Sequence, residues 1–142
     1  PKAAPAAARD ASRGVAVAEK ERDDRLEADV VGVLVKNLPS GLQQSDLLQA
    51  LRQDGFDGQI DYCSLPEVGR QAWLNFRRPH FAQELWRRWH RRRRFRHQEL
   101  PLQVVASQLQ GLEANLRSSS AQALEVRPVP FVALDALQAA QG

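Results

Sequence analysis

The feature of this sequence that most constrains its fold is the order of the short apolar stretches between residues 30 and 109. Residues 30–38 (VVGVLVKNL) are mostly apolar and β-branched, and residues 60–65 (IDYCSL) form a second run that a proline ends. Residues 71–76 (QAWLNF) alternate strictly between two faces, as a strand with one buried face does. Residues 100–109 (LPLQVVASQL) have the apolar content of a fourth strand.

Helical patterns occupy two of the intervals between these strands. The first has Ser45 as a candidate N-cap and stops at Asp54-Gly55. The second has Pro79 in its first turn and an apolar stripe that recurs at helical spacing, formed by Ala82, Leu85, Trp86 and Trp89. Residues 111–116 (GLEANL) have the pattern that opens a short third helix.

The resulting order, β-α-β-β-α-β, predicts an α+β protein with the ferredoxin-like arrangement. In that arrangement a four-stranded antiparallel sheet carries two helices on one face, and its other face is uncovered unless a tail lies on it. The chain of 142 residues has room for one such domain at 30–116. We expect 1–29 to be a linker or tail with an exposed, charge-alternating helix within 15–29, and 117–142 to be a second tail, extended near RPVPF.

Positive charge is concentrated in residues 86–97 (WRRWHRRRRFRH), which hold 7 of the 20 Lys and Arg residues and no acid. The rest of the chain has 13 basic residues against 17 acidic ones, so the basicity is local. A concentrated positive field favours contact with a polyanion, RNA first of all. Two other interpretations stay open: a helix end whose arginines are solvated and complement the helix dipole, and a nuclear address or a site for an acidic protein.

Several classes of protein are disfavoured by what the sequence lacks. Cys63 is the single cysteine, so no internal disulfide or paired-thiolate metal site can form, and a reducing compartment is favoured. His80, His90 and His97 have no carboxylate or thiol at ligand spacing, so no metal is expected. No glycine-rich phosphate loop and no nucleophile-base arrangement stands out, so we expect neither catalysis nor a cofactor.

Neither a membrane span nor a signal peptide is expected, because no run of about 18 apolar residues occurs. The chain opens on Pro1 and contains no methionine, which suits a removed start methionine, a fragment, or the processed end of a transit peptide. An intracellular location is expected, with nucleus or cytoplasm favoured and an organelle in the transit-peptide case.

The motifs on the expected strands resemble those of a known family. Residues 33–38 (VLVKNL) look like the RNP2 hexamer of RNA recognition motifs (RRMs), and residues 70–76 resemble the end of RNP1. More narrowly, four stretches are similar to the C-terminal RRM of Mei-two-like RNA-binding proteins, namely NLP at 37–39, GFDGQIDYCSLP at 55–66, AWLNF at 72–76 and QLQGLEANL at 108–116. The resemblance implies that rings on the open sheet face stack the bases of single-stranded RNA and that basic residues engage phosphates.

This sequence departs from the RRM pattern at two of the three usual ring positions, which hold Leu34 and Gln71, while the third keeps Trp73. The candidate RNA-binding residues are Lys36, Asn37, Tyr62, Arg70, Gln71, Trp73, Arg91, Arg92, Arg93, Arg94 and Arg96. The leading hypothesis is an RNA-binding module in RNA processing or post-transcriptional regulation. The alternative is an RRM-like structural or interaction subunit of a large protein or ribonucleoprotein assembly, with little RNA binding of its own.

Overall fold

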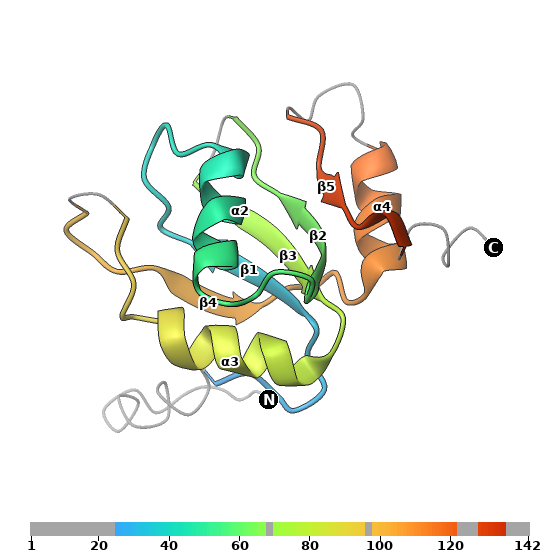
Figure 1. Cartoon of the computed structure of the whole chain (residues 1–142), viewed down its shortest axis with the longest axis horizontal. Coiled ribbons are helices and arrows are strands. Elements are labelled where there is room, and N and C mark those ends of the chain that lie inside the picture. Colours follow the sequence, from blue (N-terminus) through green and yellow to red (C-terminus); the bar gives the residue numbers. More distant parts are fainter. Residues whose placement is uncertain (1–24, 68–69, 96–97, 122–127, 136–142) are drawn as a thin grey trace, which may run out of the picture.

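The computed structural model describes residues 25–67, 70–95, 98–121 and 128–135 of the chain. Within these ranges the elements follow one another in the order expected from the sequence, with one strand added at the end (Figure 1). The elements are β1 (Gly32–Lys36), α2 (Gln44–Gln53), β2 (Ile60–Ser64), β3 (Ala72–Phe76), α3 (Pro79–Trp89), β4 (Gln103–Ala106), α4 (Leu112–Ala121) and β5 (Phe131–Val132).

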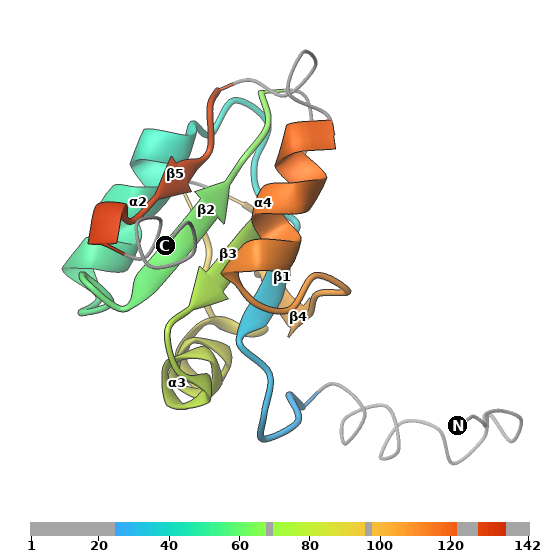
Figure 2. The same ribbon diagram turned by 90° about the vertical axis from the view of Figure 1, so that its right-hand side faces the viewer.

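The strands form one antiparallel sheet in the order β4-β1-β3-β2-β5. The helices α2 and α3 lie on one face, and α4 lies on the other, in front of the strands in Figure 2. The α+β, ferredoxin-like arrangement predicted from the sequence is therefore confirmed for β1 to β4, and the third helix is present. A C-terminal segment does lie on the second face, and β5 extends the sheet beyond the four expected strands.

The hydrophobic core lies between the sheet and the helices α2 and α3, as the alternation of the strands predicts. Val33 and Val35 of β1 and Leu74 of β3 are fully buried on this side. They belong to one cluster with leucines of both helices and with Trp89, the last residue of α3. Burial of this many branched and aromatic side chains is the main favourable contribution to folding.

The start of α2 differs from the sequence prediction. Gln43, and not Ser45, is the N-cap residue, because the Leu47 amide already donates to the Gln43 carbonyl. Asp46 takes the role expected of a capping side chain, and its Oδ2 accepts from the Gln43 amide at 3.0 Å. The predicted end of α2 at Asp54-Gly55 and the predicted place of Pro79 in the first turn of α3 are both confirmed.

The terminal regions can be compared with expectation only in part. The exposed helix expected within 15–29 falls mostly outside the described residues, and residues 25–29 contain a turn and no helix. At the other end, α4 continues past residue 116 to Ala121, and β5 pairs with β2. The division of the chain into a domain and two tails stays a prediction. No helix in the described part of the chain is long and apolar enough to cross a membrane.

Candidate nucleic-acid interface

The sheet face turned away from the core consists of three rows of side chains, set by the strand register. The middle row pairs Leu34 of β1 with Trp73 of β3, and Val105 of β4 lies on the other side of Leu34. One end row contains Lys36 and, opposite it, Gln103. The other end row, which we call the covered row, contains Gly32, Asn75 and Tyr62.

The segment that leads into α4 closes the covered row. Tyr62 is 3% exposed and Asn75 is 2% exposed, although both side chains point away from the core. The Gly111 amide donates to Oδ1 of Asn75 at 2.9 Å, which attaches the start of α4 to β3. A Cβ on Gly32 would lie 2.1 Å from the Leu109 carbonyl oxygen, so only glycine fits at that position of β1. Tyr62, a predicted RNA-binding residue, is thus buried in this conformation.

A buried polar network lies beneath the same end of α4. Nδ2 of Asn75 donates to Oδ1 of Asp61 at 2.8 Å, so one asparagine connects β2, β3 and the start of α4. Burial raises the pKa of the Asp61 carboxyl, and the hydrogen bond from Asn75 and the charge of Arg77 partly offset that rise. The network therefore carries an acid in a place where its charge is disfavoured.

The rest of this face is more accessible. Leu34, Trp73 and Val105 in the middle row are half-buried, and Lys36 and Gln103 in the far row are half-buried as well. Beside that row, Gln71 is exposed just before β3 begins. Trp73 is therefore the one ring on the described part of this face that retains substantial exposure.

The arginine-rich segment begins where α3 ends, and hydrogen bonds hold its backbone in place. Arg91 has a positive φ of 60°, which turns the chain back toward the sheet. Its amide donates to the Leu102 carbonyl at 2.8 Å, and the Leu102 amide donates to the Arg93 carbonyl at 2.8 Å. The side chains of Arg91, Arg92 and Arg94 are exposed on this fixed turn.

Arg93, also a candidate RNA-binding residue, is packed against other side chains, unlike the exposed Arg91, Arg92 and Arg94. Its guanidinium lies 5.1 Å from the ring centre of Trp89 and 4.9 Å from that of Phe95. Its Nη1 is 3.2 Å from Oδ2 of Asp54, which also accepts from the Trp89 indole nitrogen at 2.7 Å. These contacts tie the end of α3 to the end of α2, so Arg93 serves the fold. Arg96 lies outside the described residues.

Two other predicted residues, Asn37 and Arg70, form hydrogen bonds at the Lys36 end of the sheet. The side-chain amide of Asn37 donates to the Pro101 carbonyl, and the Asn37 carbonyl accepts from the side chain of Gln98. Nε of Arg70 donates to the Leu38 carbonyl at 2.8 Å. Both hold the chain directly after β1, so the loop that follows the arginines is attached at the Lys36 end of the sheet.

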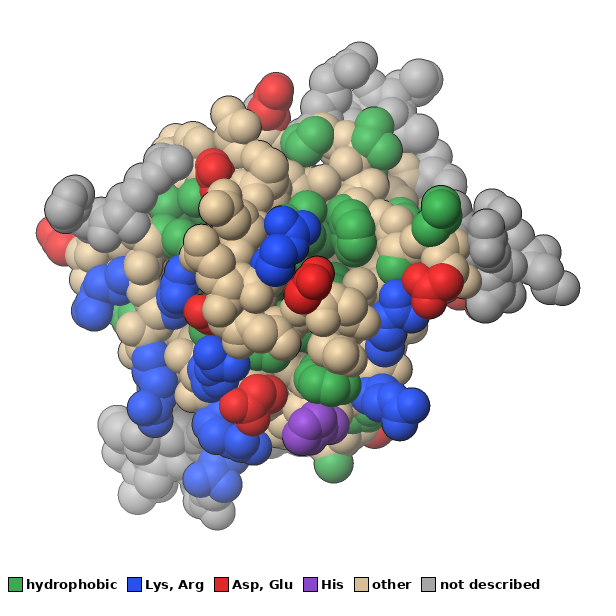
Figure 3. Space-filling model, viewed as in Figure 1, with side chains coloured by type: hydrophobic (Ala, Val, Ile, Leu, Met, Phe, Trp, Pro, Cys, Tyr) green, Lys and Arg blue, Asp and Glu red, His purple; other side chains and the backbone are tan. Residues whose placement is uncertain are grey.

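Lys and Arg side chains gather at one end of the molecule. In Figure 3 they lie mainly at the lower left, over the end of α3 and the loop that follows it. This is the same end to which Gln98 and Pro101 attach the loop. The local charge seen in the sequence thus forms a surface patch at the end of the molecule where the loop is attached to the residue that follows β1.

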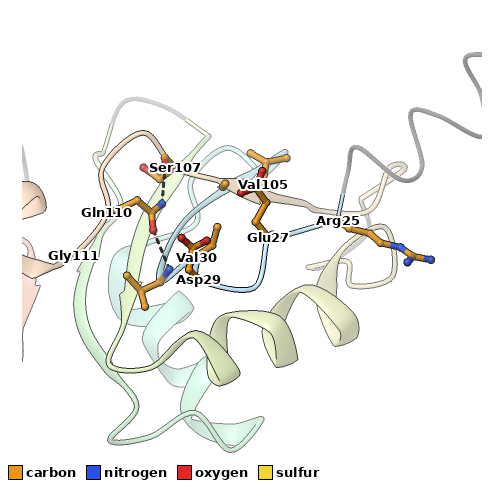
Figure 4. A pocket seen from close by; sticks show the side chains of 10 residues that line it. Arg25, Glu27, Asp29, Val30, Val105, Ser107, Gln110 and Gly111 are labelled. Atoms are coloured by element: carbon orange, nitrogen blue, oxygen red, sulfur yellow. Dashed lines mark hydrogen bonds between the residues drawn. The ribbon is translucent and has the colours of Figure 1, made fainter. Parts of the chain in front are cut away.

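A cavity of about 600 Å³ lies beside Val105, between residues 25–31 and the linker that precedes α4 (Figure 4). Gln110 forms its inner wall: its Oε1 accepts from the amides of Val31 and Gly32, and its Nε2 donates to two carbonyls, those of Gly32 and Ser107. Because all four bonds are made within the fold, Gln110 has a structural role. The charged lining residues are Arg25, Glu27 and Asp29, all exposed.

Groups that bind metals or act as nucleophiles are sparse. No group of three or more His, Cys, Asp or Glu side chains that could hold a metal ion occurs among the described residues. Nδ1 of the buried His90 accepts from the Val104 amide at 2.9 Å, and His97 lies outside the described ranges. Burial raises the pKa of the Cys63 thiol, so this side chain stays protonated in the core.

Sequence reasoning missed several residues that shape this surface. Asp54 was expected only to end a helix, yet its carboxylate accepts from Trp89 and Arg93. Gln98 has no signal in its neighbourhood that would single it out. Gly111 and Asn115 lie in the stretch QLQGLEANL that carries the family resemblance, which is the one signal that could have pointed to them.

No family model matches this chain, and no curated protein does. Among solved structures, the chain is similar to the RRM of RNA15, with 15% identity and a TM-score of 0.43 over 56% of this chain and 91% of that one. It is also similar to the second RNA-binding domain of a hypothetical protein, with 22% identity and a TM-score of 0.45 over 70% of this chain and 89% of that one. At these identities and TM-scores the likeness assigns neither a family nor a function to this chain.

Proposed function

We propose that this chain is a non-catalytic, RRM-like module that binds single-stranded RNA. The exposed arginines of the turn after α3 engage phosphates, and the accessible rows of the sheet, with Lys36 and Trp73, receive a base. The observation that carries the proposal is the attachment of the arginine-rich loop to the end of β1, through Asn37, Gln98 and Pro101. This attachment holds the arginine-rich loop at the Lys36 end of the sheet, one row beyond Leu34 and Trp73, which supports a single RNA path over both.

The balance of the two contributions follows from the side chains present. Arginine pairs with phosphate oxygens bidentately, and each neutralised phosphate releases counterions. Stacking on one ring contributes about 1 to 3 kcal/mol for each base. With only Trp73 accessible, the electrostatic part dominates, so we expect affinity to fall steeply as salt increases.

The test is a fluorescence anisotropy titration with a labelled single-stranded RNA of about twelve nucleotides, at salt concentrations from about 50 to about 200 mM. We expect R92Q/R94Q to reduce the slope of log affinity against log salt by about 1.4, because about 0.7 is lost for each phosphate contact. W73A lowers affinity about 5-fold or more and leaves that slope unchanged, since it removes stacking and no charge.

The matched control is R52Q/R78Q, which removes the same charge from two exposed arginines outside the arginine-rich segment, one in α2 and one directly before α3. It should keep the slope of the natural chain. Equal flattening in both double variants would show that net charge, and not this turn, contacts the RNA. Absence of binding even at the lowest salt would overturn the proposal.

The narrower assignment rests on the sequence. We propose that the domain is related to the C-terminal RRM of Mei-two-like proteins and takes part in RNA processing or post-transcriptional regulation. The four similar stretches in matching order support this. The last of them contains Gly111 and the first five residues of α4, 112–116.

One observation favours the second candidate function, a structural subunit of a protein or ribonucleoprotein assembly. The edge next to β2 presents apolar side chains to solvent: Val129 is 81% exposed, Leu134 is 71% exposed, and Phe131 lies between them. Exposed apolar patches at a sheet edge are typical of protein contacts. This function gains support if the titration described above finds no RNA binding.

A further inference from the structure

We propose that α4 is a displaceable cover, and that the covered row beneath it, centred on Tyr62 and Asn75, binds bases of single-stranded RNA when α4 moves away. This inference rests on the proposed function, because it extends the RNA path across the same sheet face. In the closed conformation RNA reaches the turn and Trp73. In the open conformation it also reaches β2.

The covered row has the chemistry of a base site. Tyr62 lies one strand and one row away from Trp73 on the same face, so its ring would provide a second stacking platform. Oδ1 of Asn75 now accepts from the Gly111 amide. When that amide withdraws, the oxygen becomes an acceptor for a base amino group, while Nδ2 keeps its bond to Asp61. A ring and an amide oxygen side by side suit base stacking and edge recognition together.

None of the described residues of α4 belongs to the hydrophobic core cluster that α2 and α3 form with the sheet. Among the residues of α4 whose burial is described, the most deeply buried is polar: Asn115 is 1% exposed, and its Oδ1 has no hydrogen-bond partner. Its Nδ2 donates to the Gly111 carbonyl within the same turn, so the side chain makes no bond to the sheet. A buried acceptor without a donor disfavours the docked state, since water would satisfy it after release.

The helix itself is also weak. It has ten residues, among them Ser118, Ser119 and Ser120 in succession, and Oγ of Ser119 donates back to carbonyls of the preceding turn. Helices of this length are marginal in water without packing. Gly111 directly precedes α4 and has a φ of 93°, a backbone conformation that glycine adopts easily. We infer that the helix turns about this residue when it moves away.

The first experiment weakens α4 from its solvent side. Glu113 and Arg117 form an exposed ion pair there, at 3.3 Å. E113G/R117G keeps the net charge and disfavours the helix by a factor of about 5 for each glycine relative to alanine. We expect it to bind the twelve-nucleotide RNA at least about 5-fold more tightly than E113A/R117A, the control that loses the same ion pair and keeps a helix-forming sequence.

The second experiment strengthens the cover. N115L replaces the amide whose buried Oδ1 lacks a donor by an apolar side chain of similar size, so α4 should dock more firmly. We expect RNA affinity to fall about 3-fold or more while the midpoint of urea unfolding rises. A merely structural role would raise the midpoint and leave RNA affinity unchanged, and that result would overturn the inference.

Hydrogen exchange in the natural chain gives the direct readout. With saturating RNA, the amides of Gly111 and α4 should lose protection while those of β1 and β3 keep it. RNA binding with unchanged or increased protection of α4 would overturn the cover and leave the proposed function standing. If neither the natural chain nor E113G/R117G binds RNA, both proposals fail. Binding by the glycine variant alone would support the cover.

Discussion

At the scale of single residues, the surface beneath α4 contains an unfavourable charge. Asp61 is buried beside Asn75, and burial raises the pKa of its carboxyl above the ordinary value of 3.8. An acid whose pKa is higher in the folded state than in the unfolded state stabilises the fold fully only below the unfolded pKa. That stability is lost as pH rises through the folded pKa. At neutral pH the ionised carboxylate therefore lowers the free energy of unfolding.

D61N tests this account, because the amide oxygen still accepts from Asn75 and carries no charge. We expect the variant to be more stable than the natural chain at pH 7 and equal to it below about pH 3.8. Urea unfolding at a series of pH values measures the difference. A constant difference across the whole series would show that packing, and not ionisation, separates the two proteins.

At the scale of elements, the sequence predicted what short-range periodicity encodes. The strict alternation in 71–76 and the stripe of Ala82, Leu85 and Trp89 correspond to β3 and α3 because one face of each is apolar. The place of α4 was not predictable from periodicity, since the residue it buries most deeply is Asn115. The strand β5 has two residues and pairs with β2, which lies far earlier in the sequence, and no local pattern predicts such a pairing.

The arginine-rich segment shows the same limit. Its charge was evident in the sequence, but its division into exposed arginines and the packed Arg93 depends on the positive φ at Arg91. That turn directs one side chain of the run between Trp89 and Phe95. The backbone of this turn is hydrogen-bonded to Leu102, beyond the loop that follows the arginines, and so its conformation could not be inferred from composition.

The connection between α2 and α3 yields a prediction at this scale. D54A leaves the Trp89 indole N–H without its acceptor and Arg93 without its partner. We expect the free energy of unfolding to fall by about 2 kcal/mol in urea titrations. D57A is the control. Asp57 is exposed and lies 3.6 Å from the exposed Arg52, and such a surface ion pair contributes little to stability. Similar losses in both variants would contradict a special role for Asp54.

At the scale of the whole molecule, the C-terminal segment joins three parts of the fold. Nε2 of Gln44 in α2 donates to the Val129 carbonyl at 3.0 Å, and the Ala133 amide donates to the Asp61 carbonyl in β2. Arg77, after β3, forms a two-bonded ion pair with Asp135 at 2.8 and 2.9 Å. Residues 128–135 thus contact α2, β2 and the end of β3, although they follow the predicted domain in sequence.

These attachments differ in burial, and so in their expected contribution to stability. Gln44 is buried, and its Oε1 also accepts from the buried Leu65 amide at 3.0 Å, so Q44A deprives a buried donor of its partner. We expect that change to lower the free energy of unfolding by about 1 to 3 kcal/mol. D135N disrupts an ion pair whose acid is largely exposed, and should lower it by less than about 1 kcal/mol.

Urea unfolding of both variants, followed by tryptophan fluorescence, decides between the two kinds of attachment. If D135N proves as damaging as Q44A, the charge pair rather than the buried amide holds the C-terminal segment to the sheet. The expected order instead places the main attachment at Gln44, where one side chain satisfies both the end of β2 and the residues that lead into β5. In that case β5 stays on the sheet edge at high salt, where RNA binding through the arginines is weakened.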